Sequence, residues 1–116
     1  MEDIKLDLGH VKISRQVLEQ LIAKSLKDIT GVHLIKPTFA DKIKETLGYV
    51  KQPGIGIKVD DEQELSLEVS VNIVYGVNIP EVARKIQDIV KQDIKKALDI
   101  TVKDINVEIE GIEKGE

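Results

Sequence analysis

The residues of this sequence that could carry out chemistry are few, and their spacing does not favour catalysis. The chain has no cysteine, which excludes thiol nucleophiles, zinc–thiolate sites and disulfide bonds. Its two histidines, His10 and His33, lack the paired spacing of a metal site, so we assign them a structural or solvent-facing role. Ser14 stands at the expected start of a helix with no evident base beside it, which favours a helix cap over a nucleophile.

Two further patterns do not match the ligand-binding motifs that they suggest at first sight. The acidic residues Asp60, Asp61 and Glu62 do not have the spacing of an EF-hand and are typical of a solvated turn. The Gly-Ile-Gly segment at residues 54–56 lacks the third glycine and the following helix of a dinucleotide fingerprint. We therefore predict that the protein is not an enzyme and has no catalytic residue, no metal site and no cofactor.

A row of small or polar side chains alternates with apolar ones between residues 65 and 73. This polar row consists of Ser66, Glu68, Ser70 and Asn72. The simpler interpretation is the solvated face of a sheet, because antiparallel sheets commonly leave one face in water. The alternative is a candidate interface, since a sheet face with small side chains can accept another subunit.

A second candidate surface is basic. Arg84, Lys91 and Lys95 fall close to one face of a predicted helix. Ordinary solvation is again the simpler interpretation, because Glu81 is spaced to pair with Lys85 on the same helix. The alternatives are contact with an acidic partner, or a nucleic-acid-binding regulatory module in which these cations neutralise phosphates.

Length and composition predict one domain with an aliphatic core. The chain has 116 residues, 41% of them hydrophobic, but only two tyrosines and one phenylalanine, so Ile, Val and Leu must fill the core. The net charge of −4 weighs against a general binder of phosphate backbones. No apolar run approaches the roughly 20 residues that span a bilayer, and Glu2, Asp3 and Asp7 interrupt any signal peptide. We expect a single cytoplasmic domain over residues 1–116.

The stretch between residues 65 and 111 predicts a strand, a tight turn, a long helix and a second strand. Apolar side chains alternate over 65–73 and again over 105–109, which indicates strands buried on one face. Between them, helical spacing of apolar residues begins after a set of turn, N-cap, first-turn proline and capping-box signals. These turn and cap residues are Tyr75, Gly76, Asn78, Pro80 and Glu81.

The remaining segments predict shorter elements before this unit. Strands are expected near residues 4–8, 11–13, 32–35 and 55–59, a long helix follows Ser14 and ends near Gly31, and a short helix covers residues 38–48. We predict an α+β fold of two layers. A mostly antiparallel sheet of about five strands carries two long helices and one short helix, all packed on one face.

Several motifs recur in the order that one known family shows. They are Tyr75-Gly76, then Ile79-Pro80-Glu81-Val82-Ala83, then Ile86-Gln87 in the helix, and a closing strand from Val102 to Ile112. In this order they resemble the alkaline shock protein family of Gram-positive bacteria, also called the Gls type of general stress protein. The N-terminal half adds Gly9-x-Val11-x-Ile13-Ser14 and Gly31-Val32, so the resemblance covers nearly the whole chain.

The resemblance implies a cytoplasmic, non-catalytic protein that is linked to cell-envelope stress. Members of the family associate with the membrane through a separate anchored partner, and some self-assemble. Short members resemble partners or modulators of lipid-related metabolic enzymes. On this basis we expect an interaction or scaffold protein that forms homo-oligomers or docks on an enzyme or a membrane-anchored partner.

Overall fold

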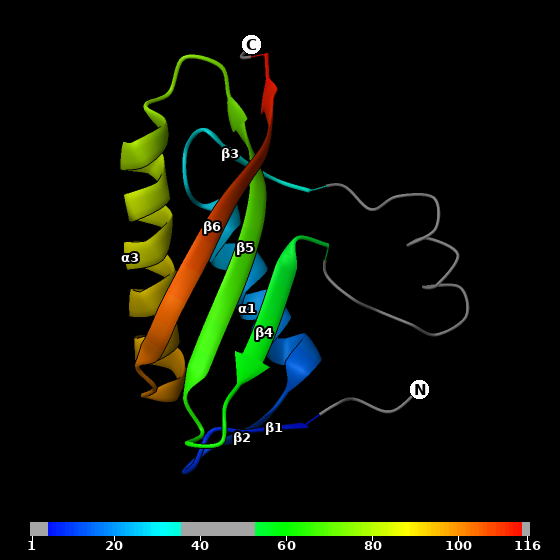
Figure 1. Ribbon diagram of the computed structural model, residues 1–116, viewed down its shortest axis with the longest axis vertical. Helices are drawn as coiled ribbons and strands as arrows, with labels where there is room; N and C mark the ends of the chain where they lie inside the picture. Colours follow the sequence, from blue (N-terminus) through cyan, green and yellow to red (C-terminus); the bar gives the residue numbers. More distant parts are fainter. Residues whose placement is uncertain (1–4, 36–52, 115–116) are drawn as a thin grey trace, which may run out of the picture.

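The computed structural model describes residues 5–35 and 53–114, which form two helices and six strands (Figure 1). In chain order the elements are β1 (Lys5–Asp7), β2 (Lys12–Ser14), α1 (Arg15–Lys27), β3 (Val32–Leu34), β4 (Ile55–Val59), β5 (Leu65–Val74), α3 (Ile79–Leu98) and β6 (Val102–Glu113). The short helix predicted at residues 38–48 lies outside the described residues.

Strand β5 is the centre of the main sheet. β3 and β4 pair antiparallel with successive parts of β5, at residues 71–73 and 65–69, while β6 runs parallel along the full length of the strand. Because β6 occupies one edge of β5, β3 and β4 share the other edge. The α+β class predicted from the sequence is confirmed. The described residues, however, form a four-stranded sheet and a separate β1–β2 sheet instead of one sheet of about five strands.

The separate β1–β2 sheet results from a tight turn at Gly9, where the alternation of apolar and polar residues shifts by one position. Gly9 has a φ of +94°, and its N–H donates to the carboxylate of Asp7 at 3.0 Å. The N–H of Leu8 donates to the carbonyl of Val11 at 2.9 Å and closes the turn. The chain therefore reverses here, and β1 and β2 form an antiparallel pair of their own.

The parallel pairing of β6 follows from the length of the helix before it. Helix α3 has 20 residues and β5 has 10, so both elements are about 30 Å long. The helix therefore returns the chain to the level where β5 began, and the next strand runs in the same direction as β5. In Figure 1, α3 runs beside β6 and β6 lies next to β5.

The core lies between the sheet and the two helices. Alternate side chains of β5 are almost completely buried, and α1 and α3 each contribute a stripe that is fully buried. These residues are Leu65, Leu67, Val69, Val71 and Ile73 from β5, Leu18, Ile22 and Leu26 from α1, and Ile86, Val90 and Ile94 from α3. The opposite face of β5 carries no helix among the described elements, so the sheet has one apolar face and one open face (Figure 1).

The two helices begin in different ways. At α3 the side chain of Asn78 accepts a hydrogen bond from the N–H of Glu81 at 3.0 Å, and Pro80 lies in the first turn. At α1, Ser14 occupies the N-cap position, but its hydroxyl makes no capping bond and is buried. The predicted capping role of the Ser14 side chain is therefore wrong, because the residue also ends β2 and its side chain points into the protein.

Two other details of α1 differ from the sequence pattern. Helical spacing places Val17 on the apolar stripe, but its side chain is 50% exposed because the buried face of the helix centres on Leu18 and Ile22. The helix ends at Lys27 with Asp28 as its C-cap, and Gly31 lies further along. With a φ of +86°, Gly31 turns the chain into β3 and is not the residue that caps the helix.

Candidate functional site

The polar row of β5 faces away from the two helices. Its side chains alternate with the buried ones of the same strand, and Glu68 is exposed while Ser66, Ser70 and Asn72 are half-buried. Parallel pairing places residues of β6 beside the row: Asp104 beside Ser66, Asn106 beside Glu68, and Glu108 beside Ser70. The row is therefore one of two adjacent rows on the open face of the sheet.

The serine hydroxyls of the row are bound to carboxylates of the neighbouring strand. Ser66 Oγ donates to Asp104 Oδ2 at 3.1 Å, and Ser70 Oγ donates to Glu108 Oε2 at 3.4 Å. The surface that a partner would meet is thus formed by carboxylates more than by hydroxyls. We call this surface the acidic face and define it by Glu68, Asp104, Glu108 and Glu113 together with Ser66, Ser70 and Asn72.

The acidic face has little relief because glycines stand where side chains would otherwise project. A Cβ at Gly111 would lie 3.0 Å from Asn72 Oδ1, and a Cβ at Gly56 would lie 3.4 Å from the Cβ of Glu68. A shallow hollow of about 470 Å³ lies over Glu68 and Asp104 and is bordered by two cations, Lys58 on β4 and Arg15 at the start of α1. The lining of this hollow is mostly polar and charged, which suits a protein partner of complementary charge.

The two histidines lie apart from each other. His10 is exposed in the β1–β2 turn, and this turn belongs to the separate sheet and not to the main one. His33, on β3, extends its Nδ1 to the carboxylate of Glu113 on the far side of β5, over the open face. Among the described residues, no group of three or more His, Cys, Asp or Glu side chains could hold a metal ion.

The predicted turn and cap residues lie together at one end of β5. Gly76 has a φ of +99°, a backbone conformation that favours glycine. A Cβ added at this residue would have no atom within 4 Å, so lack of space is not the reason for the glycine. The N–H of Tyr75 donates to the carbonyl of Glu113 at 2.7 Å and ends the pairing of β5 with β6. The Tyr75 side chain is 78% exposed and is the member of this group that is most available for contact.

The predicted basic surface lies on the exposed side of α3. Arg84, Lys91 and Lys95 are all exposed, and they lie on one side of the helix at spacings of seven and four residues. Lys95 pairs with Asp99 at 2.9 Å, whereas Arg84 and Lys91 have no ion-pair partner within residues 5–35 and 53–114. The Glu81–Lys85 pair expected from the sequence does not form in the described part of the chain.

Gln87 has a role that sequence reasoning did not assign. Its side-chain amide donates to the backbone carbonyl of Ile105 at 2.9 Å. This hydrogen bond joins α3 directly to the backbone of β6. The spacing of Gln87 within the helix could not reveal this partner, because the position of β6 was unknown.

The turn between β4 and β5 is organised by the carboxylate of Asp60. Asp60 Oδ1 accepts the N–H groups of Glu64 and Glu62, each at 2.9 Å, and Oδ2 lies 3.4 Å from Nζ of Lys103 on β6. The hydrogen bond from the backbone N–H of Glu64 lowers the pKa of Asp60 below its usual value. The backbone N–H of Glu62 and the ammonium group of Lys103 lower this pKa further. This turn thereby connects the hairpin to the start of β6.

Replacing Asp60 with asparagine is expected to lower the melting temperature at neutral pH but not in acid. Asparagine keeps a carbonyl acceptor for the turn but removes the charge that Lys103 contacts. A folded-state pKa below the unfolded value of about 3.9 adds stability above that value and loses it as pH falls through the lower pKa. Thermal denaturation should therefore show a gap between the two proteins at neutral pH that closes as the pH falls through the lowered pKa of Asp60. A gap independent of pH would contradict this role of the charge.

Comparison with known proteins gives consistent matches over nearly the whole chain. The sequence profile of the alkaline shock protein family, a family with a cell envelope-related function, matches residues 3–114. The protein YqhY of Bacillus subtilis is 30% identical over 107 residues, which cover 91% of this chain and 78% of the relative. The protein Spy1535 of Streptococcus pyogenes is 28% identical over 107 residues, covering 90% of this chain and 80% of the relative.

A more distant relative carries a descriptive name. The stress response regulator gls24 homolog of Streptococcus pyogenes is 20% identical over 109 residues. The match covers 93% of this chain but 61% of the length of that protein. No solved structure shows a significant match to the chain. No helix among residues 5–35 and 53–114 is long and apolar enough to cross a membrane.

Proposed function

Because this chain belongs to the alkaline shock protein family, whose function is related to the cell envelope, we propose that it is a non-catalytic interaction protein of envelope-stress homeostasis. The name of the more distant streptococcal relative supports the link to stress. The match of the family profile confirms the family membership that the motifs between residues 75 and 112 indicate. The protein works in the cytoplasm and reaches the membrane through a protein partner.

The observation that carries this proposal is the acidic face of the sheet. It presents the exposed carboxylates of Glu68, Asp104 and Glu108 on a flat surface opposite the helices. Two serine hydroxyls and the bordering Arg15 and Lys58 offset only part of this charge, so a complementary surface that supplies further cations is favoured. The partner therefore docks a surface rich in lysine or arginine across β5 and β6.

Two kinds of partner meet this requirement. The first is a second copy of the chain, which can offer Arg84 and Lys91 on its α3 to the acidic face of its neighbour. Such a contact is head-to-tail and would extend into rings or filaments, because two different surfaces meet. The second is an enzyme or a membrane-anchored protein with a basic docking surface. Pairing of two acidic faces is disfavoured by charge repulsion.

The test is charge reversal on the acidic face. Glu68→Lys combined with Glu108→Lys should weaken docking about 100-fold and leave the fold unchanged. Docking that persists in this variant would exclude the acidic face as the interface. Light scattering of the unaltered chain distinguishes the two kinds of partner, since a molar mass that grows with concentration indicates a second copy.

A nucleic-acid-binding regulatory role is the second candidate. It is supported by Arg84, Lys91 and Lys95, which project from one side of α3 and include two cations without ion-pair partners in the described part of the chain. Real phosphate contacts give binding that weakens steeply as the salt concentration rises. An absence of binding at low salt would exclude this role.

A further inference from the structure

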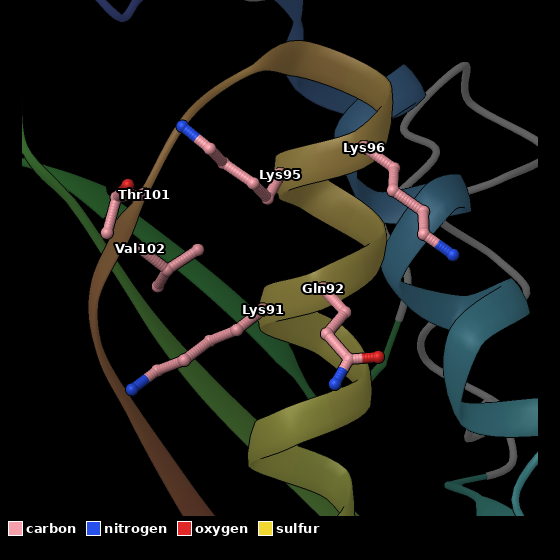
Figure 2. A pocket seen from close by; sticks show the side chains of 6 residues that line it. All are labelled: Lys91, Gln92, Lys95, Lys96, Thr101 and Val102. Atoms are coloured by element: carbon pink, nitrogen blue, oxygen red, sulfur yellow. The ribbon is translucent and has the colours of Figure 1, made fainter.

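A hollow of about 470 Å³ lies between the last turns of α3 and the start of β6 (Figure 2). Its lining consists of Lys91, Gln92, Lys95, Lys96, Thr101 and Val102. The hollow exists because α3 ends at Leu98 and Asp99 reverses the chain with a φ of +56°, so that β6 begins beside the helix. It lies on the helix side of the sheet and is therefore distinct from the acidic face.

The floor of the hollow is apolar and its rim is cationic. In Figure 2, Lys91 and Lys95 extend from α3 toward β6 on either side of Val102, while Gln92 and Lys96 point to the other side of the helix. A lysine side chain has a four-carbon stem that covers apolar surface and an ammonium group that stays in water. Val102 is 3% exposed, so the aliphatic surface that a ligand meets is formed mainly by the stems of Lys91 and Lys95 above it.

The cations of the rim differ in their availability. Lys95 is paired with Asp99, and its charge also complements the negative end of the helix dipole at the C-terminus of α3. Lys91 and Lys96 have no ion-pair partner within the described part of the chain. Lys91 lies one turn before Lys95 and further from the helix end. Lys91 is consequently the cation best placed to hold an anion beside the apolar floor.

The composition of the hollow restricts what it can bind. A small bare anion gains little here, because the C-terminal carbonyls of α3 oppose negative charge. A single-stranded nucleic acid requires aromatic side chains for stacking, and the lining has none. A molecule with both an alkyl chain and an anionic head gains from the aliphatic surface and from Lys91 together.

We propose that this hollow binds a monomeric single-chain amphiphile with an anionic head group. The alkyl chain lies over Val102 and the lysine stems, and the head contacts the ammonium of Lys91. This site goes beyond the docking of a protein on the acidic face, and it would compete with docking only where the partner is a second copy that uses Lys91. It gives the helix side of the protein a binding site for free alkyl carboxylates.

The test uses decanoate as the probe, below the concentration at which it forms micelles, with NMR detection of the methyl groups of Val102 and Thr101. Decanoate should shift these resonances in a saturable manner. Acetate, which has the head without the chain, and decyltrimethylammonium, which has the chain with a cationic head, should not. Shifts of equal size with decyltrimethylammonium would overturn the proposal, because the lysine charge would then have no role.

Matched variants separate the charge of Lys91 from its stem. Lys91→Met keeps an aliphatic side chain and removes the ammonium, and it should weaken decanoate binding about tenfold. Lys91→Glu should abolish binding. Lys85→Met, on the same helix but outside the hollow, should leave the affinity unchanged, and melting temperatures identify any variant that fails to fold. Unchanged affinity in Lys91→Met would overturn the proposal.

Two further probes distinguish the free amphiphile from other anions. Phosphatidylglycerol vesicles present anionic heads whose chains are held in a bilayer, and a single-stranded oligonucleotide presents phosphates without chains. We expect monomeric decanoate alone, without vesicles or oligonucleotide, to shift the NMR resonances of the Val102 methyl groups. Binding to vesicles or to the oligonucleotide combined with no response to decanoate would overturn it in favour of a membrane surface or a nucleic acid.

Discussion

Replacing Val69 with aspartate is expected to unfold the protein, while replacing the adjacent Ser70 with lysine leaves it folded. Val69 is fully buried at the centre of β5, between β4 and β6. A carboxylate there has no cation to pair with and is kept neutral only by a pKa raised several units, which costs about 4 kcal/mol at neutral pH. Losing the buried valine side chain adds about 1.5 kcal/mol or more. The sum is comparable to the whole stability of a small domain.

Ser70→Lys is the matched control for this prediction. Its side chain is half-buried on the open face, and its hydroxyl lies 3.4 Å from Glu108 Oε2. A lysine can extend into water and pair with the Glu108 carboxylate. Circular dichroism during urea denaturation should therefore show an ordinary unfolding transition for Ser70→Lys and none for Val69→Asp. Equal stability of the two variants would mean that β5 does not have one buried and one open face.

The two faces of β5 could be predicted from the sequence because alternation alone determines them. The start of α3 could be predicted for a similar reason, since Asn78 and Glu81 are three residues apart and their hydrogen bond is local. In both cases the physical interaction lies within a few residues of the chain. No knowledge of the tertiary structure is needed.

The carboxylates of β6 could not be assigned to the candidate site from the sequence. Asp104 and Glu108 are 38 residues from Ser66 and Ser70, and their contacts depend on the parallel pairing of β6 with β5. Sequence patterns give the faces of a strand but not its neighbour or its direction. The alternation of β5 therefore predicts the polar row without the acidic residues that determine its chemistry.

The behaviour of Ser14 has the same origin. A serine before a helical pattern usually caps the helix through its hydroxyl. Here Ser14 also pairs with Lys5 in the β1–β2 sheet, and its side chain is buried. Tertiary packing thus overrides a local preference that would hold in an isolated helix.

Reversing two charges on the acidic face should have the largest effect on function. In the Glu68→Lys and Glu108→Lys double variant, attraction to a basic partner becomes repulsion at two positions. Each reversal is expected to cost about 1.4 kcal/mol at an interface, so affinity should fall about 100-fold. The measurement is the yield of partner complex recovered from cells that express the variant. In the unaltered protein, the complex should dissociate as the salt concentration rises, because salt screens the charges.

A control with the same net charge isolates the effect of position. Two substitutions of an acid by lysine change the net charge from −4 to 0, since each adds two positive charges. Asp61→Lys combined with Glu62→Lys makes this change in the exposed β4–β5 turn, outside both the acidic face and the basic side of α3. This control should bind as the unaltered protein does. Equal losses in both variants would attribute docking to net charge and not to the acidic face.

Site-specific photo-cross-linking in cells tests the central claim most directly, namely that the open face of the sheet docks a protein. A photoreactive amino acid at Asn106, which is exposed beside Glu68, should give a defined cross-linked product. The same group at Gln92, exposed on α3, should give that product only if the partner is a second copy of the chain. A product at Gln92 that contains a different protein, with none at Asn106, would contradict the account and place the interface on the helices.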